Sequence, residues 1–87
     1  MNEQQILQEL ISILETNGIE VRKEPLRGNG GGLCEFKGKR IFFLDSQASS
    51  VDSASLCANA VEKTVDIEQL YIRPQVRQFI ELNCTGI

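Results

Sequence analysis

The chain opens with apolar residues at helical spacing and then changes to strict alternation. From Asn2 to Thr16, apolar side chains recur every three or four residues, which predicts an amphipathic helix. Asn17-Gly18 then provides a left-handed stop that few other residues adopt at low cost. Ile19–Lys23 alternates apolar and polar residues, and Pro25 follows shortly after. This period of two predicts a strand with one buried face.

Two further strands are predicted after a glycine-rich loop that runs from Arg27 to Gly32. They are Leu33–Lys37 and Arg40–Leu44, joined by a tight turn in which Gly38 supplies a positive φ. Arg40–Leu44 is apolar at positions that point to both faces of a sheet. Such a strand is typically central and covered on both sides, so we expect it in the middle of the sheet.

The second half of the chain returns to helical spacing. Ser49 lies three residues before Asp52, which resembles a capping box and predicts a helix over Val51–Thr64. Asp66–Leu70 is expected to form a short turn, and Pro74–Leu82 a last helix with proline at its first position. The order α-β-β-β-α-α predicts one α+β domain over residues 1–87, with a three-stranded antiparallel sheet packed by helices.

The composition of the chain is typical of a globular protein. The 87 residues are 41% apolar and 24% charged, values that suit one globular domain. Nine basic and twelve acidic residues give a net charge of −3, so we expect neither nucleic acid nor an anionic membrane as a partner. The N-terminus lacks the pattern of a secretory signal, and no apolar run has the length of a membrane span, so we expect a cytoplasmic location.

The residue types of the chain offer few candidates for a catalytic or metal-binding site. The chain has no histidine, which excludes any mechanism that needs an imidazole. Its cysteines, Cys34, Cys57 and Cys84, are odd in number and lie far apart, which favours free structural thiols. We therefore expect no metal, no cofactor and no complete catalytic constellation.

One candidate ligand or partner site combines the glycine-rich loop with a thiol and a carboxylate. The loop could be a flexible connector, an anion-binding nest formed with Arg27, or a partner-binding loop. Asp45 ends the expected central strand, where sites of α/β proteins often lie, but an Asp in that place also forms turns with its own backbone. The candidate residues are Arg27, Gly28, Asn29, Gly30, Gly31, Gly32, Cys34 and Asp45.

The segment from Arg40 to Glu62 resembles, in layout, part of the ImmA/IrrE-type minimal zinc metallopeptidases. In that family a hairpin strand, a polar turn and a helix bearing a His-Glu-x-x-His motif follow one another. The corresponding helix positions here read Ala58-Asn59-Ala60-Val61-Glu62. The resemblance therefore implies a non-catalytic version of the scaffold, with no zinc and no inherited catalytic residue. The combination of Gly31-Gly32-Leu33-Cys34, a hairpin that ends in Asp45 and the segment Tyr71-Ile72-Arg73-Pro74 also resembles small bacterial proteins, a likeness that names no activity.

We therefore interpret the chain as a non-catalytic protein-interaction or regulatory module, acting on a protein partner or on itself as a homodimer. The alternative is a small-ligand-binding protein or an enzyme that uses the glycine-rich loop with Cys34 and Asp45. A homodimer is expected to cover the sheet face that the first two helices leave open. The expected interface residues are Phe42, Leu44, Tyr71 and Ile72.

Overall fold

A computed structural model describes residues 2–26 and 31–84 of the chain. Helix α1 (Glu3–Thr16) begins with a capping box at Asn2. The Asn2 Oδ1 atom accepts a hydrogen bond from the Gln5 backbone N–H, and Gln5 Oε1 accepts one from the Asn2 N–H. These two bonds satisfy backbone donors that a helix N-terminus otherwise leaves without partners. Asn2 is thus the cap and not the first helical residue.

The end of α1 fixes where the sheet starts. Gly18 has φ +85°, its N–H donates to the Glu15 carbonyl, and the Ile19 N–H donates to the Leu14 carbonyl. This pair of bonds is a Schellman motif, which requires a left-handed residue at the position of Gly18. Ile19 is 2% exposed and belongs to the core. The first strand, β1 (Glu20–Glu24), therefore begins one residue later than predicted.

The sheet is mixed, so the predicted antiparallel sheet is wrong. Strands β2 (Gly31–Phe36) and β3 (Lys39–Asp45) form an antiparallel hairpin, whereas β1 runs parallel to β3. The strand order is β1-β3-β2. The hairpin leaves one edge of the apolar strand β3 open, and β1 occupies it. To reach β2 on the other edge, the chain crosses the carboxyl end of β3. The central position of β3 is as predicted.

The hairpin turn contains two residues, Lys37 and Gly38. Lys37 has φ +52° and Gly38 has φ +80°. Positive φ at both central positions defines a type I′ turn, whose twist matches that of the flanking strands. The Lys37 ammonium lies 5.4 Å from the centre of the Phe36 ring, a cation–π contact at the hairpin tip.

Helices α2 (Ser50–Thr64) and α3 (Pro74–Cys84) follow the sheet. Ser49 caps α2, since its Oγ atom accepts a hydrogen bond from the Asp52 N–H at 3.1 Å. Pro74 opens α3 as predicted. That helix continues past Leu82 to Cys84, and the Leu82 side chain is 69% exposed.

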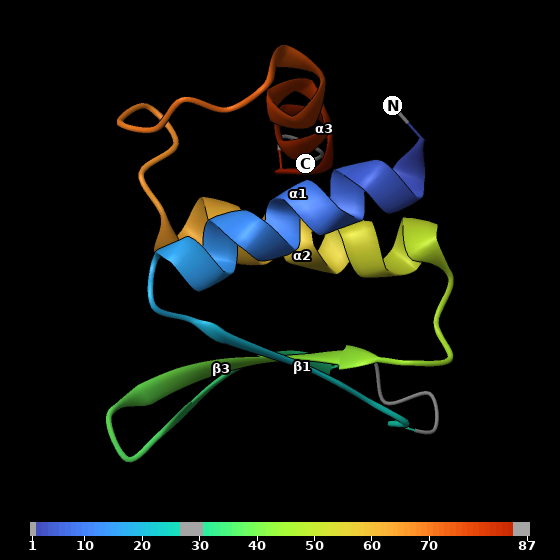
Figure 1. The fold of residues 1–87 in the computed structure, drawn as a ribbon, viewed down its shortest axis with the longest axis vertical. Coiled ribbons are helices and arrows are strands. Elements are labelled where there is room, and N and C mark those ends of the chain that lie inside the picture. Colours follow the sequence, from blue (N-terminus) through green and yellow to red (C-terminus); the bar gives the residue numbers. More distant parts are fainter. Residues whose placement is uncertain (1, 27–30, 85–87) are drawn as a thin grey trace.

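The elements form three layers (Figure 1). The sheet is one layer, α1 and α2 lie together on one of its faces, and α3 packs on the side of these helices away from the sheet. The α+β class and the order of elements are thus confirmed. Among residues 2–26 and 31–84, no helix is long and apolar enough to cross a membrane.

The burial of β3 corrects the expected interface. Phe42 is 1% exposed and Leu44 is fully buried, and both belong to the cluster formed with α1 and α2. Ile41 and Phe43 point to the opposite face by the alternation of the strand. Neither of these two belongs to that cluster, although Ile41 is only 9% exposed. The open face therefore carries Ile41 and Phe43, and α3 packs against α1 and α2 instead of against this face.

Gly31 is required where the chain enters β2. It has φ +88°, and a Cβ atom there would lie 2.2 Å from the Phe43 carbonyl oxygen. Gly38 has a similar φ of +80° but open space around the same position. We expect Gly38→Ala to lower the free energy of unfolding by about 1 kcal/mol, for the backbone conformation alone. Gly31→Ala should cost about 2–4 kcal/mol, because the clash adds to it.

Urea denaturation of the two variants measures this difference. Gly38→Ala is the matched control, since it also places a Cβ atom at a residue with positive φ but without the close contact. Equal losses of stability in both variants would contradict the close approach of Gly31 to β3.

Candidate functional site

The structure places the predicted candidate residues in different surroundings. Residues 27–30 of the glycine-rich loop lie outside the described residues. Gly31 and Gly32 form the first positions of β2 and not a loop. Cys34 is exposed on β2, whereas Asp45 is 6% exposed at the end of β3.

Asp45 holds the chain where it crosses the end of β3. Its Oδ1 atom accepts hydrogen bonds from the Leu26 N–H at 3.3 Å and the Gln47 N–H at 2.9 Å. The Ser46 N–H donates to the Glu24 carbonyl at 2.9 Å beside it. The carboxylate therefore joins the segment after β1 to the turn after β3. This is the turn-forming role that was one of the two interpretations of this residue.

Cys34 and Asp45 do not form a joint site. Cys34 is the register partner of Ile41, and Asp45 lies four positions further along β3. At about 3.3 Å per residue this separates them by ~13 Å. A thiol and a carboxylate at that distance cannot act on the same small group. The structure therefore does not assemble the predicted combination.

A hollow of about 620 Å³ lies between the end of β3 and one side of α2. Its volume is within the usual range for small-molecule sites. Asp45 is the predicted candidate that reaches it, together with groups on α2 that sequence patterns did not indicate. It is lined by Asp45, Gln47, Ala48, Asp52, Ser55, Leu56 and Asn59.

The thiols of Cys34 and Cys57 lie in different surroundings, one exposed and one buried. Cys57 is fully buried in the core, and this burial raises the pKa of its thiol from the ordinary 9.0 to about 12. Lys23 lowers that pKa by a smaller amount. Within residues 2–26 and 31–84, no group of three or more Cys, Asp and Glu side chains could hold a metal ion.

A second candidate region lies along α1. Three hollows of about 320, 160 and 190 Å³ adjoin one another and share Glu9 as a lining residue. Their other wall is the segment from Leu70 to Val76. Arg73 Nε lies 2.9 Å from Glu9 Oε1, an ion pair that connects the two walls. We call these adjoining hollows the α1 groove.

Tyr71 stands at the rim of the α1 groove with 90% of its surface exposed. It was one of the interface residues expected from sequence. The next residue, Ile72, was expected beside it but is 8% exposed and packs in the core. The chain therefore anchors the segment through Ile72 and displays Tyr71. An amphipathic aromatic ring in this position is typical of protein interfaces.

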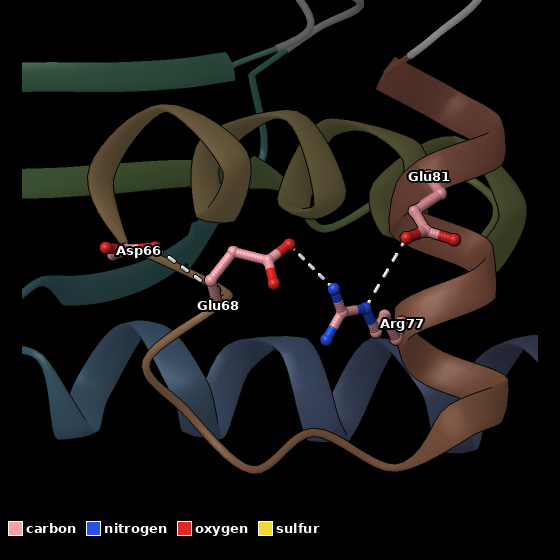
Figure 2. Close-up of polar contacts among 4 residues, drawn as sticks. All are labelled: Asp66, Glu68, Arg77 and Glu81. Atoms are coloured by element: carbon pink, nitrogen blue, oxygen red, sulfur yellow. Dashed lines mark hydrogen bonds and ion pairs between the residues drawn. The ribbon is translucent and has the colours of Figure 1, made fainter.

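A polar network holds the segment that carries Tyr71 (Figure 2). Asp66 Oδ1 accepts a hydrogen bond from the Glu68 N–H, and the Glu68 carboxylate binds Arg77 Nη2 at 2.7 Å. Glu81 approaches Arg77 Nε at 3.4 Å from the same helix. Glu68 and, to a smaller extent, Glu81 raise the pKa of the Arg77 guanidinium. The network ties the connection after α2 to the first turns of α3.

No family model, no curated protein and no solved structure matches the chain. The resemblance to a metallopeptidase-type scaffold therefore stays a prediction.

The role of Asp45 can be tested by paired substitutions. Asp45→Ala should lower the free energy of unfolding by about 1–3 kcal/mol, because the part-buried N–H groups of Leu26 and Gln47 lose their acceptor. Asp45→Asn keeps a side-chain oxygen in place and should cost about 1 kcal/mol or less. Urea denaturation gives both values. A stability of Asp45→Ala equal to that of the wild type would contradict the structural role.

The pKa of Cys57 predicts a dependence of stability on pH. The folded state holds its proton up to about pH 12, whereas the unfolded thiol releases it near 9.0. The contribution of Cys57 to stability is therefore full below pH 9 and is lost as the pH rises towards 12. The slope is at most about 1.4 kcal/mol per pH unit.

Denaturation of the wild type and of Cys57→Ala at several pH values isolates this effect, because other groups titrate alike in both. We expect the variant to be less stable at neutral pH, with a difference that shrinks above pH 9. A constant difference across that range would show that the thiol is not desolvated.

Proposed function

We propose that this protein is a non-catalytic interaction module that binds a protein partner in the α1 groove. The observation that carries the proposal is the 90% exposure of Tyr71 beside that groove. A tyrosine side chain supplies a large contact area and one hydrogen-bonding group at low conformational cost. A ring left in solvent next to a hollow is a typical anchor for a partner.

The groove also has the chemistry of a peptide-binding surface. Ile13 and Leu70 give it an apolar floor, whereas Glu9 and Arg73 place opposite charges along its length. Apolar contacts supply affinity and the charged pair supplies orientation. The anchored Ile72 and the Glu68–Arg77 ion pair hold one wall in place before binding. A preorganised wall lowers the entropic cost of association.

A second candidate function is the binding of a small molecule in the hollow beside Asp45. Its volume and its several polar lining groups favour this alternative. The Asp45 carboxylate already accepts two backbone hydrogen bonds there, which leaves it less free to bind a ligand. We therefore rank this function second. A metabolite that raises the melting temperature of the wild type but not of Asn59→Leu would support it.

Photo-crosslinking from within the groove tests the interaction. We expect a photoreactive amino acid at Ser12, which is exposed and lines two of the hollows, to give adducts of defined mass in the native host. Tyr71→Ala should reduce these adducts at least fivefold, because the anchor is lost, while stability changes by about 0.5 kcal/mol or less. The partner identified from the adduct is then purified and its affinity measured by calorimetry.

The same photoreactive amino acid at Glu62, exposed on α2, is the matched control. Equal adducts from both positions, or adducts from Ser12 that Tyr71→Ala leaves unchanged, would contradict the proposal.

A further inference from the structure

The two edges of the sheet differ in chemistry. In β1, four of the five residues Glu20–Glu24 are charged, which is a usual protection of an exposed edge against pairing. Strand β2 has one charged residue, Glu35, and no proline. Two of the exposed large apolar side chains of the described chain lie on it: Leu33 is 37% and Phe36 is 62% exposed. The β2 edge therefore lacks the protection that β1 has.

The turn geometry determines which backbone groups of β2 face outward. In a two-residue type I′ hairpin, the pair that closes the turn is hydrogen-bonded, here Phe36 with Lys39. Hydrogen-bonded and non-bonded pairs alternate along an antiparallel ladder. The N–H and C=O groups of Cys34 therefore face β3, and those of Leu33 and Glu35 face away from the sheet. This edge can receive another antiparallel strand.

We propose that β2 pairs with β2 of a second copy of this chain, about a two-fold axis at Leu33, to form a six-stranded sheet. In this register Leu33 lies opposite Leu33 of the second copy. Glu35 then lies opposite Gly31, which has no side chain, so that no two charges of like sign meet. Moving the axis to Glu35 would place two carboxylates opposite each other, which destabilises a strand pair. The charge pattern therefore favours self-pairing at Leu33.

Pairing through one short strand buries less surface than the roughly 1,200–2,000 Å² that stable complexes bury. The dimer is therefore weak, and its population depends on protein concentration. It uses a surface separate from the α1 groove. Tyr71→Ala should therefore leave the dimer unchanged, and failure of this inference leaves the proposed function standing.

Substitution of Glu35 separates the edge from the fold. Glu35→Pro removes an outward N–H and places a ring on the free edge, while the bonds from Cys34 and Phe36 to β3 remain. Glu35→Ala is the matched control, since it removes the same charge and keeps the N–H. Sedimentation equilibrium from about 10 to about 500 µM should show a weak dimer for the wild type. Glu35→Ala should stay within about twofold of the wild-type dissociation constant, and Glu35→Pro should raise it at least tenfold.

Disulfide formation tests the register and does not need the proline variant to fold. In a Cys34→Ser, Cys84→Ser background, Leu33→Cys places two thiols opposite each other with Cα atoms about 5.5 Å apart, within disulfide reach. In a Cys84→Ser background, two Cys34 thiols would be offset by two residues and beyond about 7 Å, which prevents a direct bond. With copper phenanthroline as the oxidant, we expect rapid cross-linking of Leu33→Cys and slow cross-linking of Cys34.

A monomer at every concentration, or equal dimerisation of the two Glu35 variants, would overturn the proposal. Faster cross-linking through Cys34 than through Leu33→Cys would also overturn it, because it places the axis at another residue.

Discussion

Burial of Phe42 and Leu44 beneath α1 and α2 is the contact on which the rest of the fold depends. Both side chains are almost fully buried, and they belong to β3, a strand that is apolar on both faces. Such a strand is typically central in its sheet, with a neighbour on each edge, as β3 is here. The two-residue turn places β2 on one edge, so β1 must occupy the other. The chain must then cross the end of β3, and this crossing makes β1 parallel to it.

At that crossing, two residues that the sequence pattern made candidates for a binding site have a structural role. Asp45 is a buried carboxylate at a strand end, but it accepts backbone hydrogen bonds from both sides of the crossing. Gly31 belongs to a glycine-rich sequence, but it is needed because the Phe43 carbonyl lies where a Cβ atom would be. A buried acid and a glycine cluster are features of many binding sites. In this structure, Asp45 and Gly31 instead stabilise the topology of the sheet.

Local signals predicted the helices well, because caps and apolar spacing act within a few residues. The Asn17-Gly18 stop, the Ser49 cap and Pro74 each have the predicted role, with ends shifted by one or two residues. Strand direction failed, since alternation describes faces and not partners. One signal was available: the segment between Pro25 and Gly32 is too long for a tight hairpin, which argues against an antiparallel neighbour.

The same limitation explains why the candidate site was only partly predictable. Alternation separates Ile41 and Phe43 from Phe42 and Leu44, but it does not say which pair the helices cover. Val21 decides this, because it is the one apolar residue of β1 and is the register partner of Phe42. The exposure of Tyr71 follows from its neighbour in a similar way. Ile72 anchors the segment in the core, and the preceding side chain lies outside that core. In so small a domain, the side chains that are exposed are thus determined by which of their neighbours are buried in the core.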